Sequence, residues 1–171
     1  EVRLVATGEQ VVSRRDTAGD DALAVAWNPD GRRVASAGRL GVVTVWDAAT
    51  GKDLLALRGH KPAEPIFCLA WSPDGKRLAS GGRDQIILVW DASSGRELLS
   101  LAGHTGDIAV LAWSPEDPRL ASASFDGTIA QPRYHLRRTT PIGDALGCDV
   151  SVGPGLARDP LDNRGEVASL L

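Results

Sequence analysis

The sequence predicts an all-β fold made of repeated four-stranded antiparallel sheets, and two observations lead to this prediction. Three segments, AVAWNPDGRRVAS, CLAWSPDGKRLAS and VLAWSPEDPRLAS, follow one another along the chain, with Trp27, Trp71 and Trp113 at the same place in each. Apolar runs of five or six residues alternate with turn sequences, and no stretch has a helical period. These tryptophans are 44 and 42 residues apart, and such a nearly constant period indicates that one supersecondary unit is repeated along the chain.

Each unit is expected to contain four strands separated by specific turns. The sequence Asn28–Gly31 joins the first strand to the second, because proline presets the backbone and glycine accepts the conformation that closes the turn. Ala49–Lys52 plays the same part between the third strand and the fourth. The innermost strands, such as Phe67–Trp71 and Ala109–Trp113, are apolar on both faces. We therefore expect each of them to be buried between two neighbouring sheets.

Composition and charge exclude several classes of protein. The chain has 171 residues, of which 43% are hydrophobic and 24% charged, and this balance suits one soluble globular domain. A net charge of −3 argues against nucleic-acid binding, and no apolar run is long enough to span a membrane. Cys68 and Cys148 make no disulfide framework, so we expect a cytoplasmic protein. No cofactor-binding constellation is visible, and Cys148 and His135 are too isolated to predict a metal site.

A set of short motifs recurs in fixed order within the units. The second unit contains Gly59-His60, then a strand that ends in WSPDG, then LAS ending at Ser80, and then Trp90-Asp91. This ordered set, repeated in register, resembles the WD-repeat β-propeller family, with repeats of the bacterial type, over residues 2–131. The resemblance implies about two and a half blades of four antiparallel strands, and hence an incomplete propeller.

The alignment of the units divides the chain into five expected segments. The chain begins in the phase of a third strand, and the repeat pattern stops at Ala130. We therefore expect a fragment, with a frame shift or splice near Ala130, that needs further blades or self-association to close. The segments are the end of a preceding blade at 1–16, WD repeats at 17–58 and 59–102, a partial repeat at 103–131, and an irregular tail, frame-shifted or a degenerate blade, at 132–171.

In this family a histidine, a serine, an aspartate and a tryptophan form a buried hydrogen-bonded tetrad. A buried histidine needs partners for both ring nitrogens, which a carboxylate and a hydroxyl supply, and a buried indole N–H needs an acceptor. The first unit lacks the set, with Leu40 in the aspartate place and Thr17 or Ala18 in the histidine place. The second unit has all four residues, His60, Ser80, Asp84 and Trp90. The third has a partial set, His104, Ser122 and Asp126, with Pro132 where tryptophan belongs.

Two enzymatic interpretations compete with a structural one. A serine, a histidine and an aspartate also suit a hydrolase triad, but Ser80 lies in mid-strand, and the same serine recurs at Ser36 and Ser122, as a scaffold residue would. The propellers of quinone-dependent dehydrogenases have a similar turn sequence, with a signature tryptophan that follows the turn. Here Trp46 and Trp90 precede the turn. We therefore expect no catalytic residue in this chain.

The sequence favours a non-catalytic scaffold that binds one or more proteins through its loops. The resemblance places partner contacts at the residue before the tetrad aspartate, at Arg39, Arg83 and Phe125. Arginine and aromatic side chains are common where interface energy is concentrated. The alternative is a sensor or regulatory propeller segment of a multidomain bacterial signalling enzyme, kinase or protease-like, with its catalysis outside this chain. An arginine- and alanine-rich composition with few lysines suits a GC-rich bacterial gene.

Overall fold

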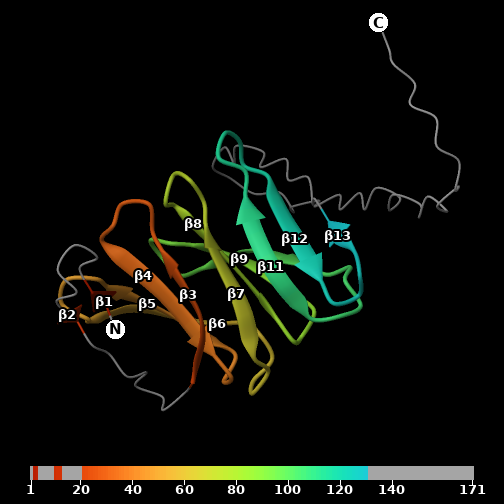
Figure 1. The fold of residues 1–171 in the computed structure, drawn as a ribbon, viewed down its shortest axis with the longest axis horizontal. Helices are drawn as coiled ribbons and strands as arrows, with labels where there is room; N and C mark the ends of the chain where they lie inside the picture. Colours follow the sequence, from red (N-terminus) through yellow and green to blue (C-terminus); the bar gives the residue numbers. More distant parts are fainter. Residues whose placement is uncertain (1, 4–9, 13–20, 131–171) are drawn as a thin grey trace, which may run out of the picture.

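The computed structural model describes residues 2–3, 10–12 and 21–130 (Figure 1). Within them every helix or strand element is a β-strand, which confirms the all-β prediction. None of these elements is a helix that could cross a membrane. The strands are β1 (Val2–Arg3), β2 (Gln10–Val12), β3 (Ala22–Trp27), β4 (Arg33–Gly38), β5 (Val42–Asp47), β6 (Asp53–Arg58), β7 (Ile66–Trp71), β8 (Arg77–Gly82), β9 (Ile87–Asp91), β10 (Glu97–Leu101), β11 (Ile108–Trp113), β12 (Leu120–Ser124) and β13 (Ile129–Ala130).

Consecutive strands pair antiparallel in simple up-and-down order. Strands β3 to β6 form a four-stranded sheet, here called sheet 1, and β7 to β10 form sheet 2. Strands β11 to β13 form the three-stranded sheet 3, and β1 pairs with β2. The expected turns connect them: Gly31 and Gly75 both have a φ near 70° (69° and 66°), and each donates its N–H to the residue three positions earlier. Glycine adopts this conformation without strain, which explains the NPDG and SPDG sequences.

The three sheets lie side by side, as Figure 1 shows. Strand β7 packs between β3 and β11, so the first strand of each sheet neighbours the first strand of the next. Two hydrophobic clusters fill the spaces between sheets. One, which includes Val45, Leu78 and Trp90, lies between sheets 1 and 2. The other, which includes Val89 and Ile108, lies between sheets 2 and 3.

A hydrogen bond from a tryptophan repeats at each contact between sheets. The indole Nε1 of Trp71 donates to the carbonyl of Ala26 in sheet 1 at 3.1 Å. Trp113 donates in the same way to Ala70 in sheet 2 at 3.0 Å. In both cases the acceptor is the alanine just before the tryptophan of the preceding sheet. The structure therefore builds the same joint twice.

The first joint has additional polar contacts. Asn28 Nδ2 donates to the carbonyl of Gly75 at 3.0 Å, and Arg33 donates to the carbonyls of Gly75 and Ala92 at 3.1 and 2.9 Å. The Arg33 guanidinium also lies over the Trp71 ring, 5.2 Å from its centroid, which is a cation–π distance. These contacts fix how sheet 1 sits on sheet 2.

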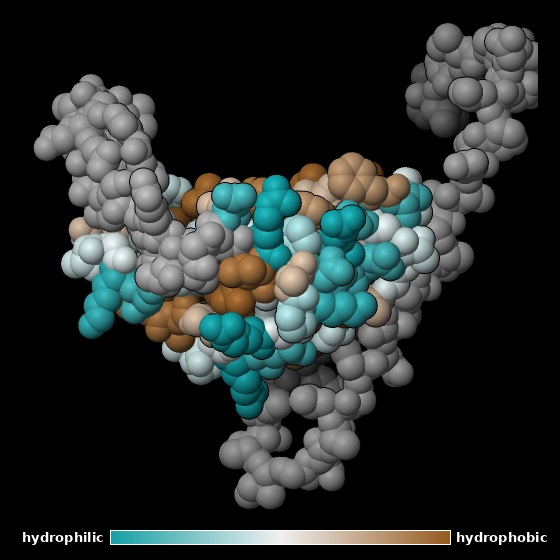
Figure 2. All heavy atoms as spheres, turned by 90° about the horizontal axis from the view of Figure 1, so that it is seen from below, coloured by the Kyte–Doolittle hydropathy of each residue, from teal (hydrophilic) through white to brown (hydrophobic). Residues whose placement is uncertain are grey.

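Strand β7 lies between two sheets, as expected, whereas among the described residues β11 has a neighbouring sheet on one face only. Strand β7 has a sheet on each side, but within the described residues no sheet covers the far face of β11, and Val110 is 56% exposed. The same holds at the other end, where Trp27 on β3 is 50% exposed. Figure 2 shows one face of the molecule, on which hydrophobic patches, in brown, lie among hydrophilic residues, in teal.

Several expectations fall outside the described residues. They concern the irregular tail at 132–171, the frame shift next to Ala130, and the side chains of Thr17, Ala18 and Pro132. Cys148 and His135 lie there as well.

Candidate functional site

The expected tetrad of the second unit comes from four neighbouring segments. His60 lies between β6 and β7, Ser80 on β8, Asp84 in the turn after β8, and Trp90 on β9. The β8–β9 register and the alternation of side chains along a strand place Ser80 and Trp90 on the face toward sheet 1. Gly59 packs against the tryptophan, because a Cβ at Gly59 would lie 2.7 Å from Trp90 Cη2. This contact explains why glycine precedes the histidine.

The structure brings all four side chains within hydrogen-bonding distance. His60 Nδ1 lies 2.9 Å from Asp84 Oδ2, and His60 Nε2 lies 2.7 Å from Ser80 Oγ. Trp90 Nε1 donates to the same Ser80 Oγ at 2.8 Å. All four residues are buried, and Ser80 is 0% exposed.

One assignment of protons satisfies the whole network. His60 donates from Nδ1 to Asp84 and accepts the Ser80 hydroxyl proton at Nε2, while Ser80 Oγ accepts the Trp90 N–H. Burial would raise the pKa of Asp84, but the hydrogen bond from His60, together with those from the N–H groups of Lys61 and Ile86, outweighs burial and holds that pKa below its usual value. The carboxylate is therefore ionised in the folded chain at neutral pH.

These distances are also those of a serine–histidine–aspartate catalytic triad, so access must decide between the two roles. A nucleophilic serine needs an open site beside it and oxyanion donors aimed at the reacting atom. Ser80 has no exposed surface, and its oxygen already accepts the Trp90 N–H. A substrate carbonyl cannot reach this hydroxyl in the structure.

The third unit repeats part of the network. His104 Nδ1 lies 2.9 Å from Asp126 Oδ2, and His104 Nε2 lies 2.9 Å from Ser122 Oγ. Hydrogen bonding from the Thr128 hydroxyl is the main cause that holds the pKa of Asp126 well below its usual value. The side chain of His104 is 6% exposed and that of His60 is 1% exposed. The expected counterpart of Trp90, at position 132, lies outside the described residues.

The first unit keeps one bond of this kind. Trp46 Nε1 donates to Ser36 Oγ at 3.2 Å, in the same relation as Trp90 to Ser80. Leu40 stands in the turn where the other units have aspartate, and it is 40% exposed. The tryptophan–serine pair is thus independent of the histidine and aspartate.

The three candidate partner-binding residues occupy equivalent turns. Arg39, Arg83 and Phe125 each follow the second strand of their sheet directly, and all three are exposed. Arg39 pairs with Asp21 at 3.4 Å, and Arg83 lies 3.9 Å from Glu64. Phe125 is 77% exposed, which is unusual for a phenyl ring.

The loop at 61–65 lies beside these turns. The N–H of Ala63 donates to the Leu40 carbonyl at 3.4 Å, and the N–H of Arg83 donates to the Pro65 carbonyl at 2.9 Å. Ala63 has a φ of 61°, a left-handed conformation that few non-glycine residues adopt. The loop therefore belongs to the same face as Arg39 and Arg83.

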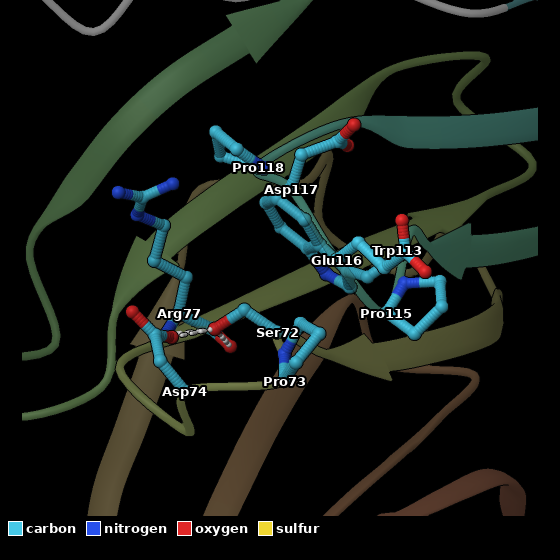
Figure 3. Close-up of a pocket in the computed structure, with 9 residues that line it drawn as sticks. All are labelled: Ser72, Pro73, Asp74, Arg77, Trp113, Pro115, Glu116, Asp117 and Pro118. Atoms are coloured by element: carbon cyan, nitrogen blue, oxygen red, sulfur yellow. Dashed lines mark hydrogen bonds between the residues drawn. The ribbon is translucent and has the colours of Figure 1, made fainter.

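A cavity of about 410 Å³ between sheets 2 and 3 was not expected from the sequence. Figure 3 shows Trp113 at its centre, with Arg77 and Asp74 on one side and Pro115 and Pro118 on others. In the equivalent place of the first joint, the space is taken by Asn28 and Arg33. Here Ser72 replaces Asn28 and turns back to donate to its neighbour Asp74 at 2.6 Å. Two features of the sequence could have predicted this cavity: serine instead of the longer asparagine at position 72, and the altered turn that follows Trp113.

Other chemical groups in the described residues form no further site. No three histidine, cysteine, aspartate or glutamate side chains there come together as a metal site. Cys68 is a buried free thiol, and burial raises its pKa to about 12, so the group is a protonated thiol rather than the nucleophilic thiolate at neutral pH.

The stacked four-stranded sheets with a buried tetrad define a propeller-type repeat domain. The family model of the WD domain, G-beta repeat, matches residues 12–47, 51–91 and 95–130, and the chain therefore belongs to the WD-repeat family. The first two matches end at Asp47 and Asp91, one residue after Trp46 and Trp90, and the third ends at Ala130, so each match begins near the last strand of one sheet and ends on the third strand of the next.

Relatives and solved structures agree with this assignment. An uncharacterized WD repeat-containing protein of Nostoc sp. is 50% identical over 38 residues, which are 22% of this chain and 2% of that protein. The structure of U3-55K and the crystal structure of the RRP9 WD40 repeats each match with a TM-score of 0.63 and 28% identity, over 70% of this chain. This chain spans 37% and 36% of those two chains, so its fold is that of an incomplete WD40 propeller.

Proposed function

We propose that this chain is a non-catalytic scaffold that binds protein partners on the face formed by Arg39, Arg83, Phe125 and the 61–65 loop. WD40 propeller domains generally mediate protein interactions and are typically not enzymes. The observation that carries the proposal is that three exposed side chains of the types common at interface hot spots occupy the same turn in three neighbouring sheets.

The charges of this face indicate the partner's chemistry. The Arg39 and Arg83 side chains are 62% and 63% exposed, and their ion pairs with Asp21 and Glu64 lie at the surface. Exposed ion pairs of this kind contribute about 0–1 kcal/mol, so a carboxylate of a partner can replace the intramolecular one at little cost. A segment that carries acidic and apolar residues would complement two guanidinium groups and a phenyl ring.

The absence of catalysis is part of the proposal and rests on the burial of Ser80. A cytoplasmic location is also proposed, and the buried free thiol of Cys68 supports it, because a cytoplasmic environment keeps thiols reduced.

The test begins with affinity capture of binding proteins by the wild-type chain. Each captured protein is then purified, and its affinity for the wild type and for two triple variants is measured. The first variant combines Arg39→Ala, Arg83→Ala and Phe125→Ala. The matched control, Lys52→Ala, Arg96→Ala and Leu54→Ala, also removes two exposed cations and one exposed apolar side chain. We expect the first variant to weaken binding at least tenfold and the control to leave it unchanged. A partner that binds both variants as well as the wild type would contradict the proposal.

A second candidate is that these repeats are the regulatory segment of a multidomain bacterial signalling enzyme. The match to 2% of the Nostoc protein supports it, because it places a repeat of this type within a far longer chain. The flanking gene sequence tests this candidate: a kinase or protease-like signature in the same reading frame would support it, and its absence would count against it.

A further inference from the structure

The cavity between sheets 2 and 3 lies away from the proposed partner-binding face. It is lined by the turn between β7 and β8 and by the turn between β11 and β12, whereas Arg83 follows β8 at the other end of that strand. Its volume of about 410 Å³ falls within the range of about 300–1,000 Å³ that is usual for ligand pockets. The cavity is therefore large enough to hold a side chain of another molecule.

The first joint shows which group occupies the equivalent space between sheets 1 and 2. The guanidinium of Arg33 lies over the Trp71 ring, 5.2 Å from its centroid. The carbonyls of Gly75 and Ala92 hold it there, at 3.1 and 2.9 Å. The face of an indole ring attracts a cation because the π-electrons make that face negative. This fold therefore holds a guanidinium against the tryptophan of the joint.

The second joint has the tryptophan but lacks the cation. Arg77 is the counterpart of Arg33, and Trp113 is the counterpart of Trp71. Among the described residues, the Arg77 guanidinium forms no hydrogen bond or ion pair, and no cation lies over the Trp113 ring. Figure 3 shows the Arg77 side chain beside the cavity, apart from this ring. The ring face that Arg33 covers in the first joint is open in the second.

The turn after Trp113 explains this difference. Gly75, whose carbonyl accepts from Arg33, has a φ of 66°. Asp117 stands in the equivalent place and does not have a positive φ. It also precedes Pro118, and proline favours an extended backbone in the residue before it. The turn therefore follows a different path and leaves Arg77 without the carbonyl that would hold it over the ring.

The charges of the lining favour a cationic ligand. Three carboxylates and one guanidinium line the cavity, those of Asp74, Glu116, Asp117 and Arg77. Arg119 pairs with Asp117 at 2.8 Å, and Figure 3 shows Arg77 beside Asp74. Glu116 is exposed and forms no ion pair or hydrogen bond through its carboxylate with any described residue. One negative charge next to the indole ring is therefore without a cation.

We propose that this cavity binds an arginine side chain of a protein partner, with the guanidinium over the Trp113 ring and paired with Glu116. The ligand takes the place that Arg33 occupies in the first joint. The cavity is rigid before binding, because Pro73, Pro115 and Pro118 in its walls have a fixed φ, and this rigidity reduces the entropy lost on binding. The proposal does not rest on the proposed partner-binding face, which suits an acidic segment.

The experiment titrates the ¹⁵N-labelled full chain with the peptide acetyl-GGRGG-amide and follows the indole N–H signals by nuclear magnetic resonance. The chain has five tryptophans, and the signal that is lost in Trp113→Phe identifies the one in the cavity. We expect the arginine peptide to shift the Trp113 signal until it saturates. A peptide with citrulline in place of arginine has nearly the same shape without the charge, and a peptide with glutamate reverses the charge. Neither should shift the Trp113 signal.

Three variants test the residues that the proposal names. Glu116→Gln should weaken binding of the arginine peptide by about fivefold, the most that one exposed ion pair contributes. Glu97→Gln removes an exposed carboxylate on β10 and is the matched control, which should bind as the wild type does. Ser72→Asn places in the cavity the residue that fills the first joint, so it should also weaken binding. Circular dichroism checks that each variant is folded.

Four results would overturn the proposal. The Trp113 signal stays in place throughout the titration with the arginine peptide, or the citrulline peptide shifts it as much. The glutamate peptide binds more tightly than the arginine peptide, which would assign the cavity to Arg77 and an anion. Glu116→Gln and Glu97→Gln bind the arginine peptide equally well, which would show that Glu116 does not hold the ligand.

Discussion

Replacing His60 with alanine should lower the free energy of unfolding by about 1–3 kcal/mol, the cost of leaving a buried polar group without its partner. The change removes the bonds to Asp84 and Ser80, which are 2.9 and 2.7 Å long. The Ser80 hydroxyl proton then has no acceptor at a position with 0% exposure. Asp84 keeps two of its hydrogen bonds, because the N–H groups of Lys61 and Ile86 still donate to its carboxylate at 3.1 and 3.3 Å. The expected loss of stability is therefore the cost of one unpaired buried group, the Ser80 hydroxyl, rather than of two.

Urea denaturation, followed by tryptophan fluorescence and circular dichroism, measures this effect at one fixed protein concentration. His104→Ala is the matched control, because it removes the same two kinds of bond in sheet 3. We expect a smaller loss there, because the Thr128 hydroxyl and the Thr105 N–H still donate to Asp126 at 2.6 and 2.9 Å after the change. Equal losses for the two variants, or an unchanged midpoint for His60→Ala, would refute the reasoning that the second unit holds the structural network.

Two further predictions concern acid and packing. The pKa values of Asp84, Asp91 and Asp126 lie below 3.8, so the stability that these carboxylates confer is fully present above 3.8 and is lost as the pH falls below it. Urea midpoints at decreasing pH should fall accordingly, and Asp84→Asn should reduce the slope; a slope identical to that of the wild type would count against the Asp84 contribution. Gly82→Ala should destabilise the chain by about 1–3 kcal/mol, because a Cβ there would overlap the Pro65 carbonyl oxygen on the neighbouring backbone. Ser100→Ala, at an exposed site, should change the urea midpoint little, and equal midpoints for the two variants would contradict this contact.

Local signals in the sequence account for the part of the fold that was predicted. The turn at Asn28–Gly31 and its repeats fix where the first strand ends, and the apolar runs between turns fix the strands. The four members of the second network were found because their spacing is the same as in the WD-repeat family. Local sequence is sufficient for these features because each depends on neighbours within one sheet.

Features that depend on adjacent sheets could not be predicted in the same way. Val110 has the sequence context of a buried strand, yet it is exposed because burial depends on which sheet packs beside it. The bond from Trp71 to the Ala26 carbonyl joins residues 45 positions apart, and no local pattern shows which backbone group accepts it. The cavity next to Trp113 has the same origin, since it forms where side chains of two sheets fail to meet.

The central claim is that the serine, histidine and aspartate of the second unit hold the propeller together and perform no catalysis. Treatment of the native chain with a fluorophosphonate probe, followed by mass spectrometry of the labelled peptides, tests it most directly. The structure predicts no labelling at Ser80, whose oxygen is buried and bonded to Trp90. Stoichiometric labelling of Ser80 in the folded chain, lost in the His60→Ala variant, would show an accessible activated nucleophile and contradict the account.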